Sequence, residues 1–204
     1  ALTIDKQATN AYLKQQGFQV AEHALVTENE WHDDPEGLFE SLKEKLGLPF
    51  VTKPADDGCS SAVKKISEWR EMVAYANLIF RKQAPLSPED ARTLGMSQGE
   101  EFPPKTAFLA EALVREEPGE RLMEITCGFL THRSEDGRLK YEVFPPSEAL
   151  AAEGILSLEE KFLAGEGQNI TPARFSNDPQ KQAEHLEEVQ QVIRGVAKSI
   201  GAYG

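Results

Sequence analysis

The chain has 204 residues, 40% hydrophobic and 8% aromatic, which is enough for one large domain or two small ones with a hydrophobic core. Its formal net charge of -12 argues against binding to nucleic acid or to an anionic membrane surface, because both require a basic face. The sequence has no run of about 18 apolar residues, no signal-peptide pattern and only two, distant cysteines. We therefore expect a protein of the reducing cytoplasm without a transmembrane helix or a disulfide framework.

The chain begins with predicted helices and strands in alternation. Apolar residues at helical spacing predict a helix over residues 3–16, and the apolar run that follows predicts a strand over residues 18–26. Asp34 and Pro35 have the order of a helix cap and a first helical residue. They predict a second helix, which ends at Gly47.

Two short strands joined by a polar loop come next. The segments LPFVTKP, residues 48–54, and SAVKKI, residues 61–66, predict a hairpin that is connected by ADDGCS. Residues 82–104 are rich in Pro, Gly and acidic residues and predict a surface excursion, with one helical turn after Ser87. Between them, Ser67 is the predicted cap of a helix with six inward positions at helical spacing: Trp69, Met72, Val73, Ala76, Ile79 and Phe80.

The second half predicts three strands, a long loop and a final helix. Turn signals separate the apolar segments 106–114, 121–132 and 138–146. Residues 145–176 predict a loop of a length that is usually functional or mobile. Residues 177–200 predict a helix, since their apolar residues recur at spacings of three and four. This order of elements predicts an α+β fold with mainly antiparallel sheet.

Lys53 ends a predicted strand beside a loop of small residues. Backbone N–H groups of such a loop and an ammonium group can together bind a phosphate. The alternative is an edge-strand lysine that reaches solvent next to an ordinary turn. The loop is not a P-loop, because the pattern G-x-x-x-x-G-K-[ST] is absent. Glu111 points to a site on separate grounds: it interrupts a strand that is otherwise predicted to be buried, and a buried carboxylate needs a partner.

Four segments carry motifs that occur in the same order in one protein family. They are ALTIDKQATNAYLKQQG, the hairpin LPFVTKPADDGCSSAVKKI, FLAEALV followed by MEITCGFL, and SLEEKFLAGEGQNITPARF. Together they cover nearly the whole chain and resemble the D-alanine–D-alanine ligase family of ATP-grasp enzymes. The hairpin matches the family's nucleotide-binding hairpin, roughly K-P-x-x-x-G-S-S-V-G-V-S-K-V, without a gap from Lys53 to Ile66. The other segments are similar to the start of the central domain, the adenine-side hinge with its next strand, and the mobile active-site loop.

The resemblance implies an ATP-dependent ligase of peptidoglycan precursor synthesis, which joins a carboxylate to an amine through an acyl phosphate. Lys6 and Lys53 would contact the phosphates of ATP. Ser60 and Ser61 would lie on the loop that closes over them, and Lys161 would reach the γ-phosphate, so that Ser60 and Lys161 are the candidate catalytic residues. The alternative for Lys6 and Lys161 is a solvated surface charge.

The same resemblance assigns the adenosine moiety of ATP to other residues. Glu111 and the backbone of Ala112 to Val114 would face the adenine, and Val51 and Val63 would give it apolar contact. Glu124 would bind the ribose hydroxyls, although an outward residue of an alternating strand can instead face water. The implied partners are ATP and a small amino-acid or 2-hydroxy-acid substrate. Mg²⁺ is implied as well, with ligands outside this chain.

Three positions depart from the family pattern. Cys59 stands where the family has its first loop serine, and Phe162 stands where a tyrosine follows the loop lysine, so two hydroxyl groups near the first substrate are absent together. Ala62 stands where the family has a glycine, which restricts the backbone of the loop. The identity of the substrate therefore stays open, whereas the expectation of ATP binding does not depend on these positions.

The resemblance also implies a domain organisation. Residues 1–113 would be the central subdomain, and residues 114–204 an incomplete C-terminal subdomain that includes a mobile loop over residues 145–176. The family continues with R-x-D and E-x-N strands, so we expect a fragment without turnover and with weak ATP affinity. Unpaired strand edges would favour self-association into a homo-oligomer, or partial disorder of residues 150–176. Two alternatives are a non-catalytic nucleotide-binding or interaction module of ATP-grasp fold, and an unrelated α+β domain with chance matches.

Overall fold

Two compact units make up the chain in a computed structural model. The first unit comprises residues 1–12 and 19–115, and the second comprises residues 13–18 and 116–204. The predicted division into subdomains between residues 113 and 114 stays a prediction. The residues that the structure describes are 2–58, 60–82, 85–97, 99–116, 122–150 and 169–203.

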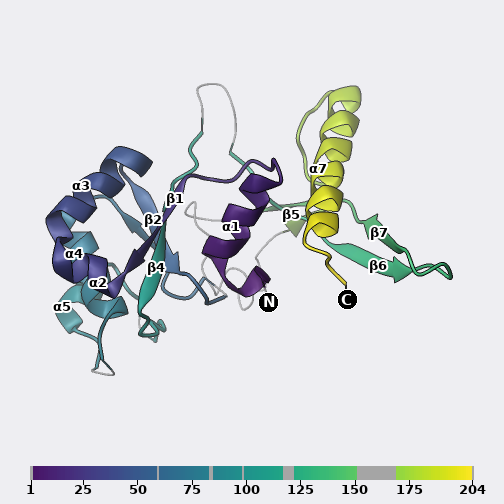
Figure 1. The fold of residues 1–204 in the computed structure, drawn as a ribbon. Coiled ribbons are helices and arrows are strands. Elements are labelled where there is room, and N and C mark those ends of the chain that lie inside the picture. The colour runs from purple at the N-terminus through teal and green to yellow at the C-terminus, as the bar shows by residue number, and fades with distance from the viewer. Residues whose placement is uncertain are drawn as a thin grey trace. The chain divides into compact units, whose positions relative to one another are not determined.

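The sheet of the first unit has four strands in the order β1-β4-β2-β3, and all neighbouring strands are antiparallel. Helices α2–α5 lie on one side of this sheet (Figure 1). The elements up to β4 are η1 (Leu2–Ile4), α1 (Lys6–Gln15), β1 (His23–Thr27), α2 (Glu28–Asp33), α3 (Pro35–Leu46), β2 (Phe50–Pro54), β3 (Lys64–Ile66), α4 (Trp69–Ile79), α5 (Pro88–Thr93) and β4 (Ala107–Ala112).

Local capping explains where the helices after β1 begin and end. The Asp34 carboxylate accepts a hydrogen bond from the N–H of Gly37, and Gly47 ends α3 with a φ of 72°, so the predicted helix is confirmed. Helix α2 was not predicted from the sequence. Its start is a capping box in which Thr27 and Glu30 each accept a hydrogen bond from the other's backbone N–H. The T-x-x-E pattern of Thr27 and Glu30 is typical of a helix start and would have predicted this short helix.

The predicted hairpin is confirmed, with β2 and β3 antiparallel. One face of the sheet packs on α2, α3 and α4 and forms an apolar core that includes Trp31, Phe39 and Met72. Tyr75 of α4 and Phe108 of β4 pack edge to face at its centre, with ring centroids 5.0 Å apart. This core holds the strands in place and leaves the opposite face of the sheet free for other contacts.

The inward face predicted for α4 agrees with the observed burial. Met72, Ala76, Ile79 and Phe80 are buried, whereas Trp69 and Val73 are partly buried against the same core. The predicted cap at Ser67 was one residue early, since the cap is Glu68. The carboxylate of Glu71 accepts a hydrogen bond from the N–H of Glu68, which replaces a serine cap.

The second unit has two small antiparallel sheets, one of strands β5-β8-β9 and one of β6-β7. The predicted strand over residues 121–132 is two strands, interrupted at Gly128, whose carbonyl oxygen accepts a hydrogen bond from the N–H of Phe144. The described residues of the predicted loop over 145–176 include two strands, which are too short to show a periodic pattern. The elements are β5 (Glu124–Thr126), β6 (Phe129–Arg133), β7 (Leu139–Val143), β8 (Ser147–Ala149), β9 (Asn169–Ile170) and α7 (Pro179–Ser199).

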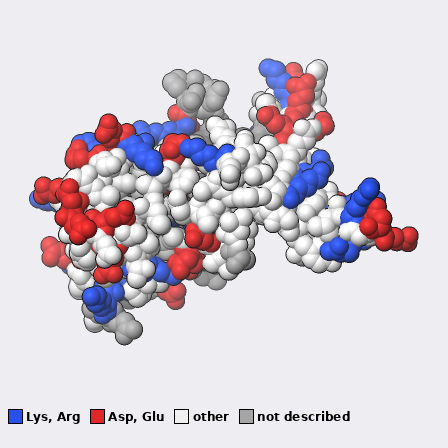
Figure 2. Space-filling model, viewed as in Figure 1, with Lys and Arg blue, Asp and Glu red and all other residues white. Residues whose placement is uncertain are grey.

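Helix α7 confirms the predicted C-terminal helix. Asp178 caps it by accepting hydrogen bonds from the N–H groups of Gln180 and Lys181. Although α7 is 21 residues long, Ala197 is its one buried residue. No helix in the described part of the chain is long and apolar enough to cross a membrane. Figure 2 shows that acidic side chains prevail over the part of the first unit that α2–α5 form, as the net charge of -12 leads one to expect.

Candidate functional site

The face of the first unit's sheet that is turned away from the core carries polar side chains. The strand register pairs Glu111 of β4 with His23 of β1 and with Val51 of β2. Directly paired residues share a face, and so do residues two apart on one strand, so Lys53 lies on this face as well. Thr52, which lies between Val51 and Lys53, points the opposite way and is fully buried.

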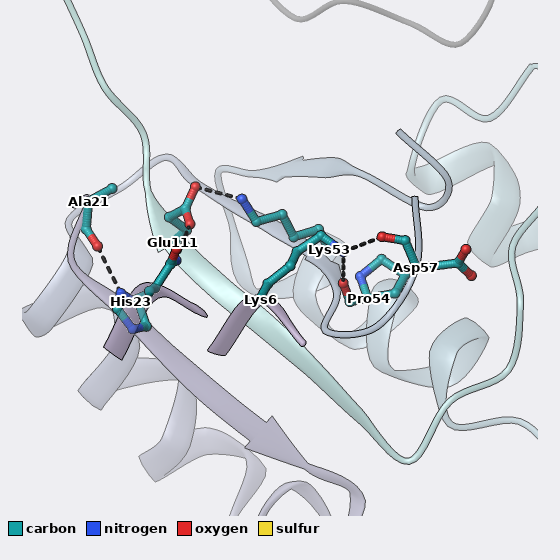
Figure 3. A network of polar contacts seen from close by, with 8 residues as sticks. Lys6, Ala21, His23, Lys53, Pro54, Asp57 and Glu111 are labelled. Atoms are coloured by element: carbon teal, nitrogen blue, oxygen red, sulfur yellow. Dashed lines mark hydrogen bonds and ion pairs between the residues drawn. The ribbon is translucent and has the colours of Figure 1, made fainter. Parts of the chain in front are cut away.

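Lys53 and Glu111 form an ion pair across β2 and β4. The Lys53 Nζ lies 2.7 Å from Glu111 Oε1, and the two side chains are 22% and 20% exposed (Figure 3). The Asn10 side chain, from α1, donates to the other carboxylate oxygen at 3.3 Å. Strand β2 lies between β4 and β3, and its pairing with β3 ends at Thr52, one residue before Lys53. The carboxylate in the predicted buried strand does have a cationic partner.

Lys6 contacts the turn after β2. Its ammonium group donates to the carbonyl oxygens of Pro54, at 2.9 Å, and of Asp57 (Figure 3). Its backbone N–H donates to the carbonyl oxygen of Ala55. The alternative of a solvated helix lysine is therefore wrong. Burial, and then the positive charge of Lys53, lower the pKa of Lys6 below its ordinary value. A second cation close to Lys6 and a lowered pKa are conditions that a bound anion would relieve.

A third lysine, which the sequence analysis did not identify, pairs with both acids of the same turn. The Lys105 Nζ lies 3.0 Å from Asp56 Oδ1 and 3.3 Å from Asp57 Oδ2. Burial alone would lower the pKa of Lys105, but the two carboxylates outweigh it and raise that pKa. A hydrogen bond from the N–H of Gly58 is the main cause of a lowered pKa for Asp57. No local pattern marks Lys105, because its partners lie far away in the sequence.

The loop that leads into β3 has a backbone of unusual conformation. Ser60 and Ala62 have positive φ values of 58° and 50°, in a region that non-glycine residues seldom adopt. The N–H of Ser61 donates to the carbonyl oxygen of Gly58 at 3.0 Å. The buried hydroxyl of Tyr75 donates to the carbonyl oxygen of Ala62 at 3.1 Å. The expectation that Ala62 occupies a position suited to glycine therefore has a structural basis.

The other predicted site residues occupy several places. Val51, Val63 and Ala112 are half-buried in the first unit, whereas Val114 is exposed just after β4. Glu124 is exposed in β5 of the second unit. Lys161, Phe162 and Cys59 lie outside the described residues. The structure therefore brings together Lys6, Lys53 and Glu111 of the predicted set.

The predicted residues that the structure brings together are two lysines and one carboxylate. Two ammonium groups lie beside the turn after β2, and ammonium groups are common partners of phosphate. The N–H groups of Gly58 and Ser61 already donate hydrogen bonds within the turn and loop. No group of three or more His, Cys, Asp or Glu side chains in the described ranges could hold a metal ion. Asn10 and His23, which neighbour Glu111 through a hydrogen bond and through the register, were not identified from the sequence.

Comparison with known proteins gives sequence matches to one group of enzymes. The family model for the D-ala D-ala ligase C-terminus matches residues 12–91. A D-alanine–D-alanine ligase of Leptospira interrogans is 26% identical over all 204 residues, which are 48% of that protein. One from Azobacteroides pseudotrichonymphae is also 26% identical over 204 residues, 50% of its length. The chain thus spans about half the length of the curated relatives it matches.

Solved structures give matches along almost the whole chain. A VanG D-Ala:D-Ser ligase from Enterococcus faecalis has a TM-score of 0.64 at 17% identity and covers 100% of this chain and 46% of its own. A D-alanine–D-alanine ligase from Bacillus anthracis has a TM-score of 0.58 at 16% identity, with 99% and 50% covered. An ADP complex of the N5-carboxyaminoimidazole ribonucleotide synthetase purK has a TM-score of 0.54 at 18% identity, with 98% and 39% covered. These likenesses confirm the predicted α+β fold class.

Proposed function

Because this chain has the ATP-grasp fold and is related to the D-alanine–D-alanine ligases, we propose that it is the nucleotide-binding part of a carboxylate–amine ligase. The whole enzyme would use ATP to convert a carboxylate into an acyl phosphate, which an amine then attacks. Its product would be a precursor of peptidoglycan. The substrate would be a small amino acid or 2-hydroxy acid, and the enzyme would act in the cytoplasm.

The observation that carries this proposal is the pair of lysines beside the turn after β2. A carboxylate must approach a triphosphate in this reaction, so their mutual repulsion is the main barrier that the protein has to lower. Burial is the main cause of the lowered pKa of Lys6, and the positive charge of Lys53 is the second. Phosphate oxygens placed between the two ammonium groups would replace the repulsion between these charges by attraction.

The ion pair between Lys53 and Glu111 suggests how the site would receive a nucleotide. On binding, Lys53 would exchange the carboxylate for a phosphate oxygen. Glu111 would then be free to accept a hydrogen bond from the amino group of adenine. Val51 and Val63 would contact the purine, and the backbone from Ala112 to Val114 would border it.

Further roles follow from the family resemblance. Ser60 and Ser61 would donate hydrogen bonds to the phosphates, and Glu124 would bind the ribose hydroxyls. Lys161 would complete the set of cations around the γ-phosphate. Mg²⁺, when bound, would neutralise part of the triphosphate charge. Its ligands would lie outside this chain.

Calorimetric titration of the chain with ATP tests the proposal. Lys53→Met should weaken ATP binding about tenfold or more, since a charge-assisted contact to phosphate is lost. Lys43→Met is the matched control, because Lys43 also forms an ion pair, with Glu40 at 2.9 Å, but on the surface of α3. It should bind ATP like the unmodified chain. Equal affinity of both variants, or absence of ATP binding by the unmodified chain, would contradict the proposal.

Measurement of ADP release distinguishes a ligase from the alternative of a non-catalytic nucleotide-binding module. A longer protein that contains this chain would release ADP when it is given ATP and D-alanine or a related substrate. ATP binding without such release across small D-amino acids and 2-hydroxy acids would favour a nucleotide-binding module.

A further inference from the structure

The turn after β2 is contacted by lysines from two different parts of the first unit. Lys6, at the start of α1, binds the backbone carbonyl oxygens of Pro54 and Asp57. Lys105, just before β4, binds the side-chain carboxylates of Asp56 and Asp57. One lysine therefore fixes the main chain of the turn, and the other holds both of its negative charges.

Lys105 is itself firmly placed. Its backbone N–H donates to the carbonyl oxygen of Ile79, the last residue of α4, at 2.7 Å. Two residues later the chain enters β4, which lies between β1 and β2 in the sheet. The Lys105 side chain is 21% exposed. The backbone of Lys105 is therefore held by α4 and the sheet, and its ammonium group is held by Asp56 and Asp57.

The charges around the turn are balanced. The electrostatic interactions that shift the pKa of Lys6 include both aspartates, which raise it, and Lys105 and Lys53, which lower it. Both aspartates and both other lysines therefore act on the charge of Lys6. The set comprises three cations and three anions: Lys6, Lys53, Lys105, Asp56, Asp57 and Glu111.

We propose that Lys105 is a positioning residue of the nucleotide site, which neutralises Asp56 and Asp57 so that the triphosphate can reach Lys6 and Lys53. This inference rests on the proposed function. Without Lys105, two uncompensated carboxylates would stand next to the cations that bind the phosphates. Like charges brought together in this way weaken association. The Asp57 carboxylate would keep the hydrogen bond from the N–H of Gly58, but its charge would lose its lysine partner close to Lys6.

The test measures ATP and adenosine affinity of the 204-residue chain by calorimetry at low and at moderate salt. Lys105→Met should weaken ATP binding about fivefold or more at low salt, and this loss should shrink as salt is added, because salt screens the aspartates. Adenosine affinity should stay unchanged, because adenosine carries no phosphate. Lys105→Arg keeps the charge and should retain ATP affinity.

A compensating variant separates charge from mere structural support. The triple substitution Asp56→Asn, Asp57→Asn and Lys105→Met removes the aspartates together with their partner and should restore ATP affinity. The double substitution Asp56→Asn and Asp57→Asn leaves Lys105 free and should bind ATP at least as tightly as the unmodified chain. If Lys105→Met fails to fold, the ATP affinity of the double variant alone tests the inference.

The outcomes distinguish the inference from the function on which it rests. If the unmodified chain binds ATP but Lys105→Met binds it equally well, or loses ATP and adenosine affinity alike, Lys105 is not a positioning residue. The same conclusion follows if the triple variant remains as weak as Lys105→Met, or if the double variant binds ATP more weakly than the unmodified chain. If the unmodified chain binds no ATP, the proposed function itself is wrong and the inference falls with it.

Discussion

The two units differ in what they bury. Of the 23 buried hydrophobic residues in the described ranges, 19 belong to the first unit, and they include phenylalanine, tyrosine and tryptophan side chains. The other four, in the second unit, are one valine and three alanines: Val143, Ala149, Ala173 and Ala197. The large side chain that is most completely buried there is a carboxylate, Glu148, which is 1% exposed.

This difference indicates which unit supplies a rigid frame for the site. Burial of apolar area is the main favourable contribution to folding, at about 25 cal/mol per Å². The first unit therefore holds β2 and β4, and with them Lys53 and Glu111, on a well-packed core. In the second unit Phe129, Leu130 and Phe144 are 36%, 41% and 44% exposed. Its described residues therefore gain less from apolar burial.

The largest expected effect is the loss of an aromatic side chain from the first unit. Phe108 is fully buried, and Phe108→Ala should lower the free energy of unfolding by about 3–5 kcal/mol. Phe129→Ala, the matched change in β6, should cost less than about 1 kcal/mol, because that ring is already 36% exposed. Urea unfolding followed by circular dichroism measures both. Equal losses would remove the contrast between the units.

A smaller effect is expected where the second unit buries a charge. Arg174 Nε lies 3.1 Å from Glu148 Oε2. Arg174→Met should lower the free energy of unfolding by about 1–3 kcal/mol, since a buried carboxylate loses a charged partner. Lys140→Met is the control, because Lys140 is exposed on β7 in the same unit. A cost for Arg174→Met no greater than that of the control would show that Glu148 is satisfied by other groups.

Helix caps should matter about equally in both units. Asp34 caps α3 in the first unit and Asp178 caps α7 in the second, each by accepting backbone N–H hydrogen bonds. Substitution of either by Ala should cost about 1 kcal/mol in unfolding measurements. A loss confined to one helix would mean that tertiary packing, rather than local capping, sets the stability of the other.

The smallest effect concerns acid pH and the first unit. Hydrogen bonds from the side chain and backbone of Thr27 lower the pKa of Glu30 below its ordinary value of 4.5. A lowered pKa in the folded state stabilises the fold above pH 4.5, and this contribution is lost as pH falls through the folded value. Glu30→Gln should make unfolding slightly less dependent on pH in that window. An unchanged pH profile would show that the capping box of α2 contributes nothing measurable.

Local signals in the sequence predicted most elements of the first unit. Asp34, Pro35 and Gly47 delimited α3 because caps depend on neighbouring residues alone. Two short apolar segments joined by the polar loop ADDGCS predicted the hairpin, and this signal is local too. β8 and β9, of three and two residues, were missed because such short strands exist only through pairing with each other and with β5.

The candidate site was predictable in its residues but not in its contacts. The isolated charge of Glu111 within an apolar strand marked it as unusual, and the resemblance marked Lys6 and Lys53. The ion pair between Lys53 and Glu111 joins residues that are 58 apart in the sequence. The contact of Lys105 with Asp56 and Asp57 likewise depends on where β4 enters the sheet. Such contacts depend on tertiary packing, and local sequence patterns therefore do not predict them.

The most direct test of the central claim is a crystal structure of the chain with a non-hydrolysable ATP analogue. The account predicts that the Lys53 ammonium group leaves Glu111 and binds a phosphate oxygen, with Lys6 on the same triphosphate and the purine beside Val51. A bound analogue elsewhere on the chain, with the ion pair between Lys53 and Glu111 intact, would contradict it.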